Sequence, residues 1–359
     1  MNIRRRLLPF IAALAATAMA ATGCSGSSDS SASAQASSAS TSVSTDAPSE
    51  IRLGYQAYAN SDLIVKNSGW LEKAFPDTKF KWSKFDSGAD VNTAFLAGAL
   101  DIGLLGSAPA SAGLSQPQNI PYQVSWIFDV TAENEALVAT KDSGVETVKG
   151  LVGKKVATPF GSTAHYALLA ALKEGGVDAG KVNIIDLQPP DILAAWQRGD
   201  IDATYVWDPT LATLKKSGTT LITSKEVADL GYPTYTVGAI TRAFSTAYPS
   251  VVQEWLRIQN RAIELIQNDP NAAAKAIGAE LALKPAEVLL QLKSAGFLNA
   301  KQQEAPAYFG TPNAPGRFVD TLFNTSTFLK EQGKVEGVPT KETLQSDIDT
   351  QNFFDAFNK

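Results

Sequence analysis

The chain has 359 residues, of which 19% are charged and 44% hydrophobic, with one cysteine and one histidine. These counts exclude an internal disulfide and the usual His/Cys metal clusters. The formal net charge is −5, and it becomes −8 once residues 1–23, which carry three arginines and no acids, are removed. This acidic balance argues against nucleic acid as a partner, because nucleic-acid binders concentrate positive charge.

The amino terminus has the pattern of an export signal. Arg4, Arg5 and Arg6 precede an apolar run from Leu7 to about Ala21, which is too short for a comfortable membrane span. Small residues stand directly before Cys24 and are similar to the lipobox of bacterial lipoproteins. That likeness implies cleavage after residue 23 and lipidation of Cys24. The alternative is a plain secretory signal followed by an unmodified cysteine.

Residues 24–49 are almost entirely Ser, Ala, Thr and Gly. Such a segment buries too little apolar surface to offset the entropy cost of ordering, so we expect a flexible tether. A lipid anchor with a tether would hold a globular part at the outer face of the cytoplasmic membrane, in a periplasm or at the cell surface. The remaining chain is long enough for two lobes.

Strands alternate with helices through the first two thirds of the globular part, which predicts a largely parallel α/β architecture. The expected strands are 51–55, 80–85, 101–105, 121–127, 135–140, 155–158, 182–187, 204–206 and 235–240. Beyond residue 240 the pattern becomes mainly helical, and the expected helices are 249–266, 270–279, 285–293 and 317–332.

Two internal sequence similarities indicate two α/β units in which strands and helices are connected in a similar order. The phrase 98–102 resembles 199–203, and 85–88 resembles 160–163. We expect lobe 1 at 51–139 and 236–359, lobe 2 at 140–235, and crossings near 136–140 and 234–241. Two crossings give hinge geometry that closes around a ligand, whose cleft lies at the carboxyl ends of the strands.

The stretch from Pro159 to Tyr166 is the strongest anion-site signal. A short strand runs through Phe160-Gly161-Ser162-Thr163 into a helix, and helix N-termini carry free N–H groups and partial positive charge. The hydroxyl of Ser162 or Thr163 can cap this helix or donate a hydrogen bond to a ligand. The alternative is that these residues only cap the helix. Ser107 and Ala108, before Pro109, begin a helix in the same way.

The chain resembles the nitrate/sulfonate/taurine-binding family of bacterial ABC importers, its taurine branch most of all. The residues that carry this resemblance extend over most of 51–335 and include Lys84-Phe85-Asp86-Ser87-Gly88-Ala89, Glu135-Ala136-Leu137-Val138, Thr163-Ala164-His165-Tyr166, the block from Leu187 to Trp207, and Phe328 to Val335. The resemblance implies a type II periplasmic-binding fold. It also implies an exported, monomeric receptor without a cofactor or metal, which passes a small sulfonate to a permease.

Taurine has a sulfonate at one end, which needs N–H and O–H donors, and an ammonium at the other, which needs an acid or an aromatic face. Thr236 stands where the family pattern has an aspartate, so Glu135 or Asp208 would have to hold the ammonium. The expected ligand contacts are Gln56, Ser107, Ala108, Glu135, Phe160, Ser162, Thr163, His165, Trp207, Asp208 and Thr236.

Two other functions stay open. One is a receptor for another small solute, such as hypotaurine, isethionate, a longer or aromatic sulfonate, or nitrate. The other is an enzyme on the same scaffold, such as a sulfinate desulfinase. The sequence offers few groups for nucleophilic catalysis, because Cys24 would be acylated and His165 has no second histidine with which to share proton transfer. We therefore expect no enzymatic activity.

Overall fold

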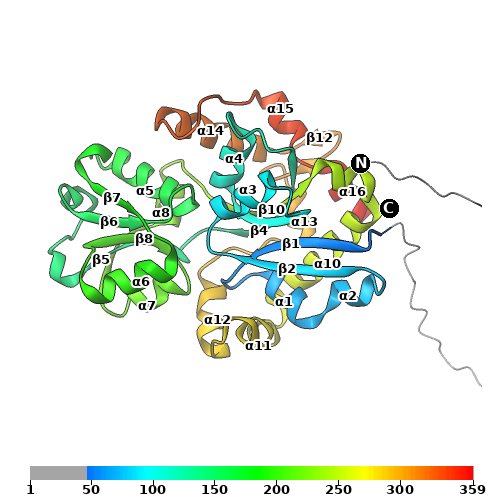
Figure 1. The fold of residues 1–359 in the computed structure, drawn as a ribbon, viewed down its shortest axis with the longest axis horizontal. Coiled ribbons are helices and arrows are strands. Elements are labelled where there is room, and N and C mark those ends of the chain that lie inside the picture. Colours follow the sequence, from blue (N-terminus) through cyan, green and yellow to red (C-terminus); the bar gives the residue numbers. More distant parts are fainter. Residues whose placement is uncertain (1–46, 359) are drawn as a thin grey trace, which may run out of the picture. The chain divides into compact units, whose positions relative to one another are not determined.

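The structure is a computed structural model that describes residues 47–358, so the predicted signal segment, Cys24 and most of the tether lie outside the described residues. The described chain builds two five-stranded sheets, each with helices packed around it (Figure 1). A short third ladder pairs β11 (Gly310–Thr311) with β12 (Ala314–Pro315).

The first sheet has the strand order β2-β1-β3-β10-β4. β1 is parallel to β2 and β3, whereas β10 is antiparallel to both β3 and β4, so one strand runs against the other four. Its strands are β1 (Glu50–Gln56), β2 (Lys79–Phe85), β3 (Ile102–Gly106), β4 (Tyr122–Val130) and β10 (Tyr235–Thr241).

The second sheet repeats this wiring in the order β7-β6-β8-β5-β9, with β5 as its one reversed strand. Its strands are β5 (Glu135–Thr140), β6 (Lys155–Thr158), β7 (Asn183–Asp186), β8 (Ala203–Trp207) and β9 (Gly218–Thr223). In each sheet the reversed strand is the one that follows a crossing from the other lobe. The predicted two-lobe α/β fold is confirmed.

The helices of the first lobe are α1 (Ser61–Ser68), α2 (Trp70–Ala74), α3 (Gly88–Leu96), α4 (Ser107–Leu114), α9 (Arg242–Ala247), α10 (Pro249–Asn268), α11 (Pro270–Leu281), α12 (Pro285–Lys293), α13 (Ala300–Gln303), α14 (Phe318–Glu331), α15 (Lys341–Ser346) and α16 (Thr350–Asn358). The second lobe has α5 (Thr163–Glu174), α6 (Pro189–Arg198), α7 (Thr210–Leu214), α8 (Ser224–Asp229) and the 3₁₀ turns Lys141–Ser143, Val148–Leu151 and Ala179–Lys181. Proline opens α10, α11 and α12, as the sequence predicts, since the first helical position needs no N–H donor.

The crossing segments are residues 131–134 and 230–234. Thr131 N–H donates to the Thr234 carbonyl at 3.1 Å, so the two segments lie side by side. The first crossing comes before β5, because β5 pairs with β8 and β9 of the second sheet, and not after residue 139 as expected. Its partners lie far along the chain, and a strand's apolar pattern does not say which sheet it joins.

The strand order also corrects the interpretation of one of the two internal sequence similarities. β3 and β8 occupy equivalent places, so the echo of 98–102 in 199–203 reflects a true repeat. β6, however, corresponds to β1 and not to β2. The similarity of 85–88 to 160–163 therefore reflects a shared way of starting a helix, with Ser87 and Ser162 as N-caps.

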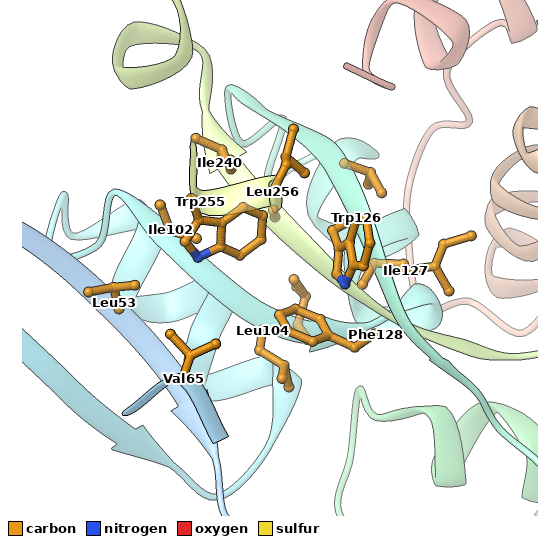
Figure 2. Packing of buried hydrophobic residues seen from close by; sticks show 14 of the residues in the cluster. Leu53, Val65, Ile102, Leu104, Trp126, Ile127, Phe128, Ile240, Trp255 and Leu256 are labelled. Carbon is orange, nitrogen blue, oxygen red and sulfur yellow. The ribbon is translucent and has the colours of Figure 1, made fainter. Parts of the chain in front are cut away.

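The core of the first lobe holds its sheet against α1 and α10 (Figure 2). Trp126 and Phe128 of β4 are fully buried, and the Phe128 ring meets Trp255 of α10 edge to face with centroids 6.1 Å apart. Such aromatic side chains bury large areas and dominate core energetics. This rigid packing fixes the strand ends from which the functional side chains extend.

α14 reaches across to the second lobe. Phe328 packs edge to face against Tyr166 of α5 and Tyr232, with centroid separations of 5.1 and 5.3 Å. At the end of the same helix, Glu331 pairs with Lys173 at 3.1 Å. α14 of the first lobe thus contacts α5 near both of its ends, at Tyr166 and at Lys173.

Candidate functional site

A small cavity lies between the lobes, and residues of both line it. The space open to the centre of a water molecule is about 30 Å³, so the enclosed guest must be small. The cavity wall consists of Gln56, Tyr58, Gly88, Gly106, Pro109, Thr131, Asn134, Glu135, Ser162, Thr163, Trp207 and Thr236.

Three helix N-termini converge on this cavity. Gly88 begins α3, Gly106 directly precedes α4, and Thr163 begins α5. The approach is close: a Cβ atom placed on Gly106 would lie only 2.4 Å from Cγ2 of Thr163 in the opposite lobe. The first N–H groups of a helix lack internal acceptors and carry partial positive charge. These helix N-termini therefore suit an oxyanion, although no lysine or arginine lies in the wall.

Ser162 acts on the cavity through the backbone. Its hydroxyl donates to the Pro159 carbonyl at 2.6 Å and accepts from the His165 N–H at 3.1 Å. With its hydrogen used and the oxygen capping α5, the side chain fixes the helix start instead of donating to a guest. The capping interpretation of this serine is confirmed, and Ser162 also lies in the cavity wall.

Glu135 is the acid of the cavity wall and is 2% exposed. Its two carboxylate oxygens accept from Thr163 Oγ1 at 2.5 Å and from Ser224 Oγ at 2.8 Å. Burial raises the pKa of Glu135 to about 7, although both hydrogen bonds lower it. Among the described residues no lysine or arginine forms an ion pair with this carboxylate, which leaves a place for a cationic guest.

The remaining wall residues include some that sequence reasoning proposed and some that it missed. Gln56, Trp207 and Thr236 lie in the wall as expected. Tyr58, Thr131 and Asn134 were missed because they lie in loops that follow strands. A search for polar residues just beyond strand ends could have found them, since such ends meet at one edge of an α/β sheet.

Asn134 adds a donor to the cavity. Its Oδ1 accepts from the Ala132 N–H at 2.8 Å, which leaves the NH₂ group free of any partner among the described residues. Gln56 has the opposite arrangement, because its Nε2 donates to the Leu104 carbonyl at 3.1 Å and its Oε1 is left as an acceptor. Donors and acceptors thus both reach the guest.

The structure places Asp208 outside this wall, in two neighbouring grooves. Its Oδ1 caps α7 by accepting from the Ala212 N–H at 2.9 Å, and its Oδ2 accepts from Ser294 at 3.5 Å. Burial raises the pKa of Asp208 to about 6. The expected replacement acid therefore serves the helix cap, and Glu135 is the one of the two that faces the cavity.

Four further expected contacts, Ser107, Ala108, Phe160 and His165, are also not part of the cavity wall. Ser107 is fully buried and its Oγ accepts from the Tyr235 N–H at 3.1 Å, while Ala108 packs in the core of the second lobe. Phe160 stacks on His165 with ring centroids 4.5 Å apart, and Nζ of Lys334 lies over the Phe160 ring, 5.7 Å from its centroid.

His165 has a structural role at the start of α5. Its Nδ1 accepts from the Gly161 N–H at 3.1 Å, which holds the Gly-Ser-Thr turn. Burial, with the nearby Lys334 charge, lowers the pKa of His165 to about 4, so the imidazole is neutral at physiological pH. A neutral ring that is stacked and hydrogen-bonded in this way supports the turn instead of contacting the guest.

The raised pKa of Glu135 predicts a pH-dependent stability. The folded state holds this proton up to about pH 7, whereas the unfolded chain releases it near 4.5, so Glu135 stabilises the fold at low pH and less as pH rises through 7. We expect Glu135→Gln to reduce the loss of unfolding free energy between pH 5 and pH 8 by on the order of 3 kcal/mol. Urea unfolding of ligand-free protein at both pH values measures this difference. An unchanged difference would show that Glu135 is ionised throughout.

Among residues 47–358, no group of three or more His, Cys, Asp or Glu side chains is arranged to hold a metal ion. Within the same residues, no helix combines the length and the apolar character that a membrane span requires.

The chain is similar to solute-binding proteins along most of its length. A model described as the NMT1-like family matches residues 44–282. The taurine-binding periplasmic protein of Escherichia coli (strain K12) is 36% identical over 294 residues, which are 80% of this chain and 88% of that protein. The putative aliphatic sulfonates-binding protein of Bacillus subtilis (strain 168) is 29% identical over 294 residues, 79% and 87% of the two chains.

A solved structure agrees with the two-lobe architecture. The alkanesulfonate-binding protein SsuA from Xanthomonas axonopodis pv. citri, bound to MOPS, matches with a TM-score of 0.67 at 23% identity, over 84% of this chain and 98% of that chain. That likeness shows the fold. The family match and the 36% identity together show descent, and the chain belongs to the NMT1-like family.

Proposed function

We propose that this protein is the extracytoplasmic solute receptor of an ABC importer, and that it captures taurine or a related small alkanesulfonate. One observation carries the proposal: three helix N-termini, two from the first lobe and one from the second, converge on a small interlobe cavity whose wall also holds the buried Glu135. Helix N-termini suit a sulfonate, and an unpaired buried carboxylate suits an ammonium. The relatives' names point to the same ligands.

Ligand capture in this proposal proceeds by closure of lobe 2 on lobe 1 about the crossing segments 131–134 and 230–234. The closed receptor would then deliver its ligand, as a monomer and without a cofactor, to the permease. In-line gel filtration and small-angle scattering with and without ligand measure both features. A radius of gyration that stays constant on saturation would contradict closure.

Isothermal titration calorimetry tests the ligand class. The panel is taurine, hypotaurine, isethionate, longer alkanesulfonates and nitrate, and we expect micromolar or tighter binding of at least one sulfonate. Lack of binding to every sulfur compound at millimolar concentration would refute the proposal.

A receptor for a different small solute is the second candidate. One observation favours it: Thr236 lines the cavity and Asp208 does not. Of the two acids considered as partners of an ammonium group, Glu135 and Asp208, the wall therefore holds only Glu135. Tight binding of isethionate or nitrate with weak binding of taurine would support it. An enzyme is disfavoured, because Nδ1 of His165 is occupied and its ring lies behind the wall.

We further propose that the protein is exported and anchored through lipid on Cys24. The arginines and apolar run before this residue support export, and the periplasmic relative agrees. Metabolic labelling with a radioactive fatty acid should mark the protein and not a Cys24→Ser variant. Equal labelling of both would contradict the anchor.

A further inference from the structure

A second buried carboxylate lies directly behind the cavity wall. Asp129 of β4 is fully buried and lies opposite Thr236 of β10 in the strand register. Its Oδ2 accepts from the Tyr58 hydroxyl at 2.7 Å, and its Oδ1 accepts from the Thr236 hydroxyl at 3.2 Å. Both hydroxyl-bearing residues line the cavity, whereas Asp129 itself does not.

These two bonds fix what the hydroxyls can offer to a guest. A hydroxyl has one hydrogen, and in Tyr58 and Thr236 that hydrogen is committed to Asp129. Burial raises the pKa of Asp129 to about 6, so near pH 7.5 the carboxyl is mainly ionised and accepts both bonds. Burial also raises the pKa of Tyr58 well above its usual range, which keeps the phenol protonated. These two hydroxyls can therefore only accept hydrogen bonds from a guest, through their lone pairs.

The neighbouring acid has the same effect. Thr163 donates its hydroxyl hydrogen to Glu135, so this oxygen too can only accept from a guest. Neither Asp129 nor Glu135 forms an ion pair with a lysine or arginine among the described residues, and the two charges raise each other's cost. The cavity thus gathers several acceptor oxygens around two buried carboxyls, which at pH 7.5 are both mainly ionised and have no cationic partner among the described residues.

We propose that Asp129 is a specificity-determining positioning residue, which turns the hydroxyls of Tyr58 and Thr236 into acceptors so that the cavity selects ligands with a primary ammonium group. Three N–H donors and one positive charge match this arrangement, whereas an alcohol brings one donor and no charge. This inference rests on the proposed function and narrows it to aminoalkanesulfonates and their close analogues. It gives Thr236 a role in ligand selection without an acid at that position.

The test compares taurine with isethionate, which differs only in having a hydroxyl in place of the ammonium. In the wild type we expect taurine to bind at least one hundred times more tightly. Asp129→Asn accepts one hydroxyl hydrogen at most and has no charge, so we expect a tenfold or greater loss for taurine and less than a threefold change for isethionate. Calorimetry at pH 7.5 gives both dissociation constants.

Asp349→Asn is the matched control. Asp349 is a buried carboxyl of the same lobe that accepts from Asn352 at 2.9 Å and lies outside the cavity wall. It should change thermal stability and leave the taurine-to-isethionate ratio as in the wild type. Tyr58→Phe and Thr236→Val each remove one acceptor and should lower that ratio even if Asp129→Asn fails to fold.

The outcomes separate this inference from the function on which it rests. Equal losses for taurine and isethionate in Asp129→Asn, or wild-type affinity for isethionate that matches taurine, would overturn the role of Asp129. A third ligand, β-alanine, has the ammonium with a carboxylate in place of the sulfonate. Binding of β-alanine without any sulfonate would refute the sulfonate receptor and leave the ammonium selection standing, and binding of none of the three would refute both.

Discussion

Glu135→Gln is expected to weaken taurine binding by one hundredfold or more, with isethionate affinity changed by only a few fold. The carboxylate lies in the cavity wall with no cationic partner among the described residues, so a bound ammonium would be its counter-charge. Removing one partner of a buried charge pair typically costs about 2–5 kcal/mol, which corresponds to roughly thirtyfold to several thousandfold in affinity. Calorimetric titration with both ligands at pH 7.5 measures the effect.

Glu146→Gln is the control for this variant. Glu146 is an exposed glutamate of the same lobe and does not belong to the cavity wall or to the crossing segments, so its neutralisation should leave both affinities unchanged. If Glu135→Gln reduced taurine and isethionate binding equally, the residue would be holding the Thr163 and Ser224 hydroxyls in place and not the ammonium.

Gly106→Ala is expected to weaken every ligand by about tenfold or more, whatever its charge. The new Cβ would lie 2.4 Å from Cγ2 of Thr163 in the opposite lobe, so the lobes could not close fully. Alanine can adopt the backbone angles of this position, φ −71° and ψ 159°, and the cost is therefore steric. Overpacking of this kind costs roughly 1–3 kcal/mol.

Thr163→Ser provides the matched rescue. Serine lacks the Cγ2 methyl group but keeps the hydroxyl that donates to Glu135. The double variant should therefore recover most of the affinity that Gly106→Ala loses. Gly150→Ala, where the nearest atom would be 3.4 Å from the added Cβ, should bind like the wild type. A double variant as weak as the single one would rule out this contact as the cause.

Local signals in the sequence predicted most of the fold, because its elements begin and end with clear chemistry. Prolines opened α10, α11 and α12 where expected, and serines capped α3 and α5. The sheet to which β5 belongs could not be predicted in this way. Its partners β8 and β9 lie dozens of residues along the chain, and only tertiary pairing brings them together.

The cavity was harder to predict than the fold, since a side chain's direction decides its role. An aspartate before a proline signalled a helix cap and a ligand contact equally well, and Asp208 is placed as the cap. Asp129 was not singled out, because it does not line the cavity and acts only through Tyr58 and Thr236. The sequence showed that Thr236 replaces the aspartate of the family pattern. Its hydrogen-bond partner Asp129, however, lies on the neighbouring strand β4 and could be found only from the structure.

The strand order of the first sheet also constrains the order in which this protein can be assembled. β10 lies between β3 and β4, yet the entire second lobe is synthesised after β4 and before β10. During synthesis or export, the first sheet therefore cannot be completed until the second lobe has emerged, whereas the strands of the second lobe are contiguous in the chain. Folding of the first lobe must wait for this long-range insertion, and pairings of such sequence separation form slowly. Until then, the facing edges of β3 and β4 lack their shared partner.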